Sequence, residues 1–259
     1  MAHITKELKL GLESLFKSQK FSDLTITCGS YSFNVHKAIV CAQSGYLDTA
    51  CRKGTFKEGE SGLIALKCVD AEGGDTDASC DDPEAVMLMV HFFYYQDYAA
   101  EAVECKGPGP AGEGGATTDG GNLIMHAKVF GTAIKYQVPG LATLAATKFK
   151  IASERNHEHA DLAEAIQVVY DTTPTDVQDL RDVVVDTLLE KKWLLKKSEI
   201  QAAIENINGL ACKLLAKTWE ANEVKPAETS PKPLAHACKY CSGPVRAADG
   251  SGSAAANVG

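Results

Sequence analysis

The sequence predicts an α+β fold, in which a small β-sheet is flanked by a helical cluster and followed by an all-helical extension and a disordered tail. Two short stretches near the N-terminus alternate between apolar and polar residues, as strands do. Apolar residues at helical spacing then recur along most of the chain. With 259 residues and 45% hydrophobic content, the chain is long enough for one domain of about 130 residues and a smaller companion.

Residues 1–20 are predicted to form an N-terminal helix. Lysines and glutamates separate its apolar residues, which form a single stripe: Leu8, Leu12, Leu15 and Phe16. A helix with one apolar stripe has to bury that stripe against another surface.

A β-hairpin is predicted next. Apolar residues alternate over residues 24–28 and again over residues 31–35, and Gly29 and Ser30 stand between the two runs. Two strands joined by a short turn of this composition pair with one buried face. At His36 the apolar period changes from two to about 3.6, which predicts that a helix follows.

The order of these elements, together with specific residues, resembles the BTB/POZ domain, and most closely the stand-alone BTB proteins of fungi. In that family an Asp opens the first strand, a His-Lys or His-Arg pair follows the second, and a Ser precedes a bulky pair on the next helix. The corresponding residues are Asp23, His36-Lys37, Ser44 and Tyr46-Leu47. Later matches follow in the family's order: Gly54 to Glu58, the strand Leu63 to Leu66, the helix Pro83 to Tyr95, and Leu123 to Phe149. The resemblance covers residues 21–150 and implies the BTB/POZ fold there.

The resemblance implies a partner-binding groove at Asp23, His36 and Lys37. In the transcription-factor branch of the family, residues at the positions of Asp23 and Lys37 form a charged pair at the floor of a groove between two protomers. An ordinary ion pair or a solvated lysine is the alternative. His36 is expected to be a structural residue that hydrogen-bonds the hairpin backbone, because no partnered nucleophile stands beside it.

Two further surfaces follow from the resemblance. Adaptors of this family often grip a cullin scaffold through an apolar anchor and an adjacent carboxylate in one loop, and Phe56 and Glu58 hold those positions. The preferred alternative is that Phe56 seals the domain core. The family also implies that the stripe of Leu8, Leu12, Leu15 and Phe16 is a homodimer surface, and packing on its own domain is the alternative.

Two insertions interrupt the predicted domain. Residues 70–82 are acidic and end in Asp81 or Asp82, either of which is a suitable helix N-cap ahead of Pro83. Residues 106–121 are so poor in apolar groups that a flexible surface loop is expected.

Beyond the domain, residues 151–221 are predicted to form an extension of three amphipathic helices, with Ser198 capping the third. Helices of this length are not stable alone, so they are expected to dock on the domain or on one another. Residues 222–259 are rich in Pro, Lys, Ser, Gly and Ala and are predicted to be a disordered tail.

The tail contains one weak candidate for a metal site, formed by His236, Cys238 and Cys241. Two thiolates at CxxC spacing can grip one Zn²⁺ ion, but a structural zinc needs four ligands. No second pair follows in the remaining residues, so a distant residue or another chain would have to complete the site. No cofactor other than zinc is expected.

Composition limits the remaining choices. A formal charge of −8 disfavours binding to nucleic acid. The nine cysteines are expected to be reduced thiols, with Cys28, Cys41, Cys68 and Cys212 inside apolar strands and helices. No apolar run approaches the roughly 20 residues that cross a bilayer, and the N-terminus does not resemble a secretory signal. A soluble protein of the cytoplasm or nucleus is expected.

The function predicted from these observations is a protein–protein interaction module, with no assembled set of catalytic groups. A homodimerising scaffold or adaptor that bridges a cullin-type ubiquitin ligase to a client is the leading interpretation. The alternative is a transcription-linked regulator, which acts by co-repressor recruitment or by zinc-assisted association with DNA.

Overall fold

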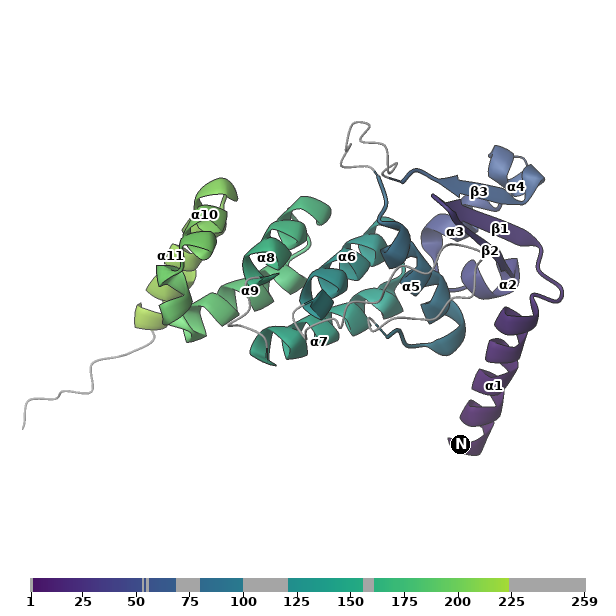
Figure 1. Cartoon of the computed structure of the whole chain (residues 1–259), viewed down its shortest axis with the longest axis horizontal. Coiled ribbons are helices and arrows are strands. Elements are labelled where there is room, and N and C mark those ends of the chain that lie inside the picture. Colours follow the sequence, from purple (N-terminus) through teal and green to yellow (C-terminus); the bar gives the residue numbers. More distant parts are fainter. Residues whose placement is uncertain are drawn as a thin grey trace, which may run out of the picture. The chain divides into compact units, whose positions relative to one another are not determined.

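A three-stranded sheet and a cluster of helices make up the N-terminal part of the computed structural model (Figure 1). The structure describes residues 2–52, 54, 56–68, 80–99, 121–155 and 161–223. Residues 1–218 form one compact unit, and a second unit begins at Trp219. Of the second unit, only the last residues of one helix are described.

The predicted hairpin is confirmed. β1 (Leu24–Cys28) and β2 (Tyr31–Val35) pair antiparallel, with Leu24 opposite Val35 and Cys28 opposite Tyr31. β3 (Leu63–Leu66) joins the other edge of β1 in parallel register, so the strand order is β2-β1-β3. Alternate residues of β1 are buried, which is the pattern expected of a sheet with one face on the core.

Seven helices accompany the sheet in the described part of the chain: α1 (Ala2–Ser18), α2 (Lys37–Val40), α3 (Gly45–Ala50), α4 (Lys57–Ser61), α5 (Pro83–Tyr95), α6 (Gly121–Lys135) and α7 (Pro139–Arg155). Helix α5 is the centre of the core and is buried on almost every side. Asp82 caps it by accepting hydrogen bonds from the backbone N–H groups of Glu84 and Ala85, and Pro83 is its first residue. The predicted start of this helix is therefore confirmed, with Asp82 as the cap.

The helical extension continues with α8 (Asp161–Thr172), α9 (Asp179–Glu190), the 3₁₀ helix η1 (Lys192–Lys196), α10 (Ser198–Asn206) and α11 (Leu210–Glu223). Helix α6 packs on α8, and α7 packs on α9, so the extension docks directly on the domain (Figure 1). Helix α7 runs through residue 150, where the domain was predicted to end, and belongs to both parts.

The prediction of three helices in the extension was wrong. The run predicted as one third helix is divided into α10 and α11 at Asn208-Gly209, where Gly209 adopts a φ of 87°. Helix α10 ends at its C-cap Ile207, whose backbone is extended, and Gly209, which has no Cβ, takes the left-handed conformation directly before α11. Ser198 is the first residue of α10 and not its cap, since Lys197 occupies the N-cap position.

The cysteine prediction was wrong for one residue. Cys28 is buried, and Cys41 and Cys68 are partly buried, but Cys212 is exposed on α11. Leu210 and Leu214 take the buried side of that helix, so Cys212 faces outward. All six cysteines of the described residues are free thiols.

Parts of several predicted segments lie outside the described residues. These are residues 70–79 and 106–120 of the two insertions and residues 224–259 of the tail. None of the helices that the structure describes is long and apolar enough to cross a membrane.

Candidate protein-interaction site

Asp23 fixes the start of α2. Its Oδ1 atom accepts a hydrogen bond of 2.7 Å from the backbone N–H of Lys37, whereas the side chain of the N-cap residue His36 makes no capping bond. The exposed Asp23 carboxylate therefore supplies from the adjoining strand the acceptor that a helix N-terminus requires. The predicted ion pair between the Asp23 and Lys37 side chains is not formed among the described residues.

His36 is fully hydrogen-bonded inside the domain. Its Nε2 lies 2.7 Å from the carbonyl oxygen of Lys20, so Nε2 carries the proton and donates it. Its Nδ1 then accepts from the Tyr94 hydroxyl at 2.8 Å, and the backbone N–H of His36 donates to the same hydroxyl oxygen at 3.0 Å. Burial raises the pKa of Tyr94 to about 12, so the hydroxyl stays protonated. These contacts join the chain before β1 to the hairpin and to α5.

The candidate groove residues thus differ in what they offer a partner. His36 is buried and its ring is occupied, while Asp23 is exposed and Lys37 is partly buried. A groove at these three residues stays a prediction, because it would form only between two chains.

Phe56 does not seal the core. It stands directly before α4, and its side chain is 49% exposed. Glu58 lies one residue into α4 and is partly buried. The structure therefore leaves Phe56 exposed and Glu58 partly accessible two residues later, and the cullin-type loop stays a prediction.

Gly59 holds this pair against the end of α3. A Cβ atom at Gly59 would lie 2.5 Å from the backbone oxygen of Arg52, closer than real Cβ atoms approach. Only glycine lets α4 pack so tightly on the backbone that follows α3. The sequence Phe56-Lys57-Glu58-Gly59 therefore combines the exposed phenylalanine and the partly buried glutamate with the glycine that lets α4 pack on α3.

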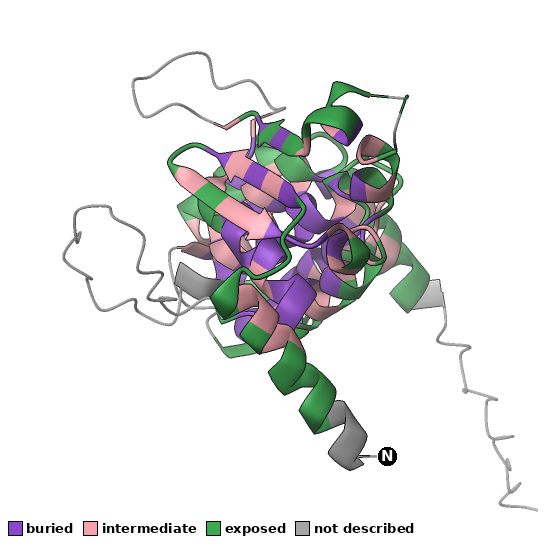
Figure 2. Ribbon diagram, turned by 90° about the vertical axis from the view of Figure 1, so that its right-hand side faces the viewer, coloured by how far each residue is buried: buried purple, intermediate pink, exposed green. Residues whose placement is uncertain are grey.

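The stripe on α1 is divided. Leu12 and Phe16 pack against the core of the same chain, and the Phe16 ring lies 4.8 Å from the Tyr94 ring and 6.0 Å from the Tyr95 ring. Leu15 is partly buried, whereas Leu8 is 64% exposed. In Figure 2 the outer turns of α1 extend away from the buried core and are exposed over residues 6–11. Packing within the chain therefore covers the C-terminal part of the stripe, which is Leu12, Leu15 and Phe16, and leaves Leu8 exposed.

Asp81 is a buried structural carboxylate that the sequence suggested only as a helix cap. It is 4% exposed and accepts hydrogen bonds from the Tyr136 hydroxyl at 2.6 Å and from Lys135 Nζ at 2.7 Å. It thereby connects the start of α5 to the end of α6. The two adjacent aspartates have different roles, since Asp82 caps α5 and Asp81 binds Tyr136 and Lys135. In the sequence, the only indication of the buried role of Asp81 was that it stands next to the predicted cap.

A second polar cluster, of which Tyr98 and His126 are buried, ties α6 and α7 to the segment after α5. The Tyr98 hydroxyl lies 2.8 Å from His126 Nδ1, and Lys148 Nζ bonds both Asp97 and the Tyr98 carbonyl oxygen. Burial, together with the charge of Lys148, lowers the pKa of His126 to about 4, so the ring is neutral near pH 7. The cluster has a structural role, and no spacing of residues along the chain indicates it.

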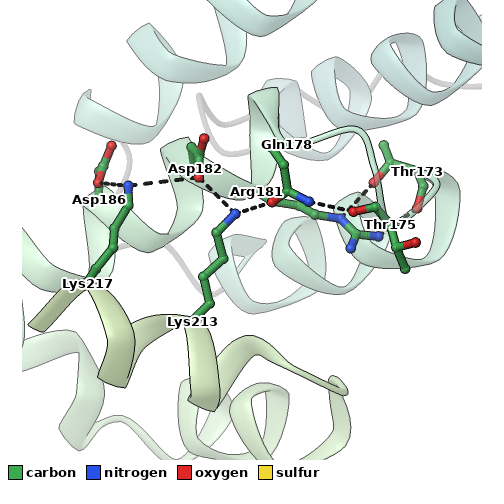
Figure 3. A network of polar contacts seen from close by, with 8 residues as sticks. All are labelled: Thr173, Thr175, Gln178, Arg181, Asp182, Asp186, Lys213 and Lys217. Carbon is green, nitrogen blue, oxygen red and sulfur yellow. Dashed lines mark hydrogen bonds and ion pairs between the residues drawn. The ribbon is translucent and has the colours of Figure 1, made fainter. Parts of the chain in front are cut away.

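The helical extension carries a row of polar contacts between α9 and α11 (Figure 3). Lys213 Nζ pairs with Asp182 at 2.8 Å and also contacts Gln178, and Lys217 Nζ pairs with Asp186 at 2.7 Å. Arg181, buried at the start of the row, donates to the Thr173 carbonyl oxygen at 2.7 Å and lies over the Tyr170 ring. These contacts attach the last helix to α9.

The metal candidates lie outside the described residues, since His236, Cys238 and Cys241 follow residue 223. Within the described residues there is no group of three or more His, Cys, Asp or Glu side chains that could hold a metal ion. The zinc site therefore stays a prediction.

The small sheet, with its hairpin, its parallel third strand and the surrounding helical cluster, is an architecture of the α+β class. The family model of the BTB/POZ domain matches residues 12–76, and the chain contains this domain. The predicted fold, a BTB/POZ domain followed by a helical region, is confirmed. No curated protein matches the sequence.

The BTB/POZ domain is a protein–protein interaction module, and this is the class of function that the chain carries. Its candidate contact residues fall on three surfaces: the Phe56–Glu58 loop, the exposed part of α1, and the surface around Asp23.

Proposed function

We propose that the protein is an adaptor that docks a cullin-type scaffold through Phe56 and Glu58 and joins a second copy of itself through α1. The observation that carries the proposal is the half-exposed phenylalanine at the start of α4. An aromatic side chain that is half exposed in the free chain offers an anchor that a pocket on another protein can bury.

The chemistry of the loop supports this docking. Burying a phenylalanine side chain completely contributes about 1.5–3 kcal/mol, and about half of that remains available at Phe56. Glu58 offers a carboxylate at the rim, where it would orient a basic residue of the scaffold more than it would add affinity. Gly59 keeps α4 against α3, so little conformational freedom is lost on binding.

Titration of the full chain with the purified N-terminal region of a cullin tests this proposal. We expect Phe56→Ala to weaken binding by about four- to twelvefold, because about half of the burial energy of the anchor is lost. Leu215→Ala is the matched control, since Leu215 is also an exposed apolar residue but lies on α11. Equal affinity for the Phe56→Ala variant and the unaltered chain, or no binding by either, would overturn the proposal.

Self-association is the second part of the proposal. The exposed half of α1 presents Leu8 at 64% and Leu10 at 55% exposure. Two such helices could cover one another across a two-fold axis, where the same patch is used by both chains. The mass of the protein in solution is the direct readout of this contact.

A further inference from the structure

We propose that Cys41 and Cys51 form a redox-sensitive thiol pair, which a disulfide oxidant converts into a disulfide within one chain. The two residues follow α2 and α3, at the C-cap of each helix, and both are partly exposed. The pair is independent of the proposed docking function, although it lies next to the α4 loop.

Cys41 and Cys51 lie close together, because both donate a hydrogen bond to the same backbone oxygen. The carbonyl oxygen of Leu47 accepts the backbone N–H of Cys51 at 2.9 Å and the thiol of Cys41 at 3.5 Å. Cys41 Sγ therefore lies beside the backbone of Cys51, on the same side of α3. Burial, together with the neighbouring Cys51 thiol, raises the pKa of Cys41 to about 12.

Because the Cys41 thiol stays protonated, the two cysteines are expected to react with the oxidant in a fixed order. A thiol that stays protonated near neutral pH is a poor first nucleophile, so Cys51 reacts first and Cys41 resolves the intermediate. With glutathione disulfide as oxidant, the Cys51 thiolate attacks one sulfur, forms a mixed disulfide and releases one glutathione thiolate. Cys41 then loses its proton and attacks the Cys51 sulfur, which releases the second glutathione. The chain loses two electrons and two protons, and two molecules of reduced glutathione are formed.

A second thiol pair in the domain provides an internal comparison. Burial, together with the neighbouring Cys68 thiol, raises the pKa of Cys28 to about 12. This pair differs because Cys28 is fully buried and because the carboxylates of Asp81 and Asp82 face it, which disfavours a thiolate further. We therefore expect oxidation at Cys41 and Cys51 before oxidation at Cys28 and Cys68.

The disulfide would act on the surface next to it. Gly59 packs on the backbone of Cys51 and Arg52, so a bond that ties Cys51 to the end of α2 restrains the support of α4. The oxidised domain is expected to hold the segment from α2 to α4 more rigidly than the reduced domain.

The experiment treats the full chain with glutathione disulfide, blocks remaining thiols by alkylation and digests with trypsin. Residues 38–52 form one tryptic peptide that contains both cysteines. We expect this peptide to lose two hydrogen atoms and to escape alkylation. In the Cys41→Ser variant the mixed disulfide at Cys51 should accumulate about tenfold above its level in the unaltered chain, because the resolving thiol is missing.

Cys212 is the positive control, because it is exposed on α11 and should form a mixed disulfide without any internal link. The proposal would be overturned if both thiols of peptide 38–52 were alkylated under conditions that modify Cys212 fully. It would also be overturned if the unaltered chain carried a stable mixed disulfide at Cys51. The unaltered chain alone decides between these outcomes, even if the serine variant fails to fold.

Discussion

At the scale of single residues, the closed set of hydrogen bonds around His36 is the most constrained feature of the domain. One tyrosine hydroxyl serves two groups of His36, its ring nitrogen and its backbone N–H. From the sequence, His36 was a member of the candidate groove and was expected to have a structural role. The sequence could not name Tyr94 as the partner, because that residue is 58 positions away and is also an ordinary apolar residue of α5.

Tyr94→Phe should lower the free energy of unfolding by about 1–3 kcal/mol, because it leaves a buried imidazole nitrogen and a buried N–H without their partner. Urea unfolding measures the change. Tyr46→Phe is the matched control, since Tyr46 is exposed, and it should stay within about 0.5 kcal/mol of the unaltered chain. Equal stability of both variants would show that the hydroxyl of Tyr94 is not required.

Phe56 shows a different limit of the sequence. An aromatic residue between two helices can be either buried or exposed. The segment around Phe56 is too short for an alternating or helical pattern of apolar residues to predict which. The position of α4, which Phe56 precedes, depends on the tight packing of Gly59 on the backbone after α3, and this is a tertiary contact.

At the scale of secondary-structure elements, the predictable features were those with strong local signals. The hairpin followed from alternation and a two-residue turn, and the start of α5 followed from Asp-Pro chemistry. The division between α10 and α11 was missed because the apolar spacing continues through Asn208-Gly209. A glycine at that point was a signal that could have been used.

Helix α11 is attached with little apolar burial. Among its described side chains only Leu210 and Leu214 are buried, while Lys213 and Lys217 reach the aspartates of α9 (Figure 3). Exposed ion pairs contribute about 0–1 kcal/mol each and are weakened by salt. The two leucines therefore supply most of the attachment, at about 1.5–3 kcal/mol each, and the ion pairs add a smaller, salt-sensitive share.

Replacing both lysines, in the variant Lys213→Gln/Lys217→Gln, should accelerate amide hydrogen exchange over residues 211–218 by about fivefold at low salt. High salt should bring the unaltered chain close to the variant. Lys192→Gln/Lys196→Gln removes the same charge from exposed positions of η1 and should leave exchange in α11 unchanged. If the control variant had the larger effect, net charge and not the specific pairs would govern the attachment.

At the scale of the whole molecule, the chain combines a BTB/POZ domain with helices that extend its packing from α6 and α7 onto α8 and α9. The sequence predicted this organisation because each part has its own period of apolar residues. It could not predict which apolar side chains stay exposed on the domain, since that depends on how α1 and α4 dock. The proposed contacts of Leu8 and Phe56 therefore rest on the structure.

The most direct test of the account is the absolute mass, by light scattering, of the full chain alone and mixed with the cullin fragment. The account predicts the mass of two chains for the protein alone and of two chains with two fragments for the mixture. Leu8→Glu should reduce the first value to one chain and still bind the fragment, because Leu8 and Phe56 lie on different helices. A mass of one chain in both samples would contradict the account.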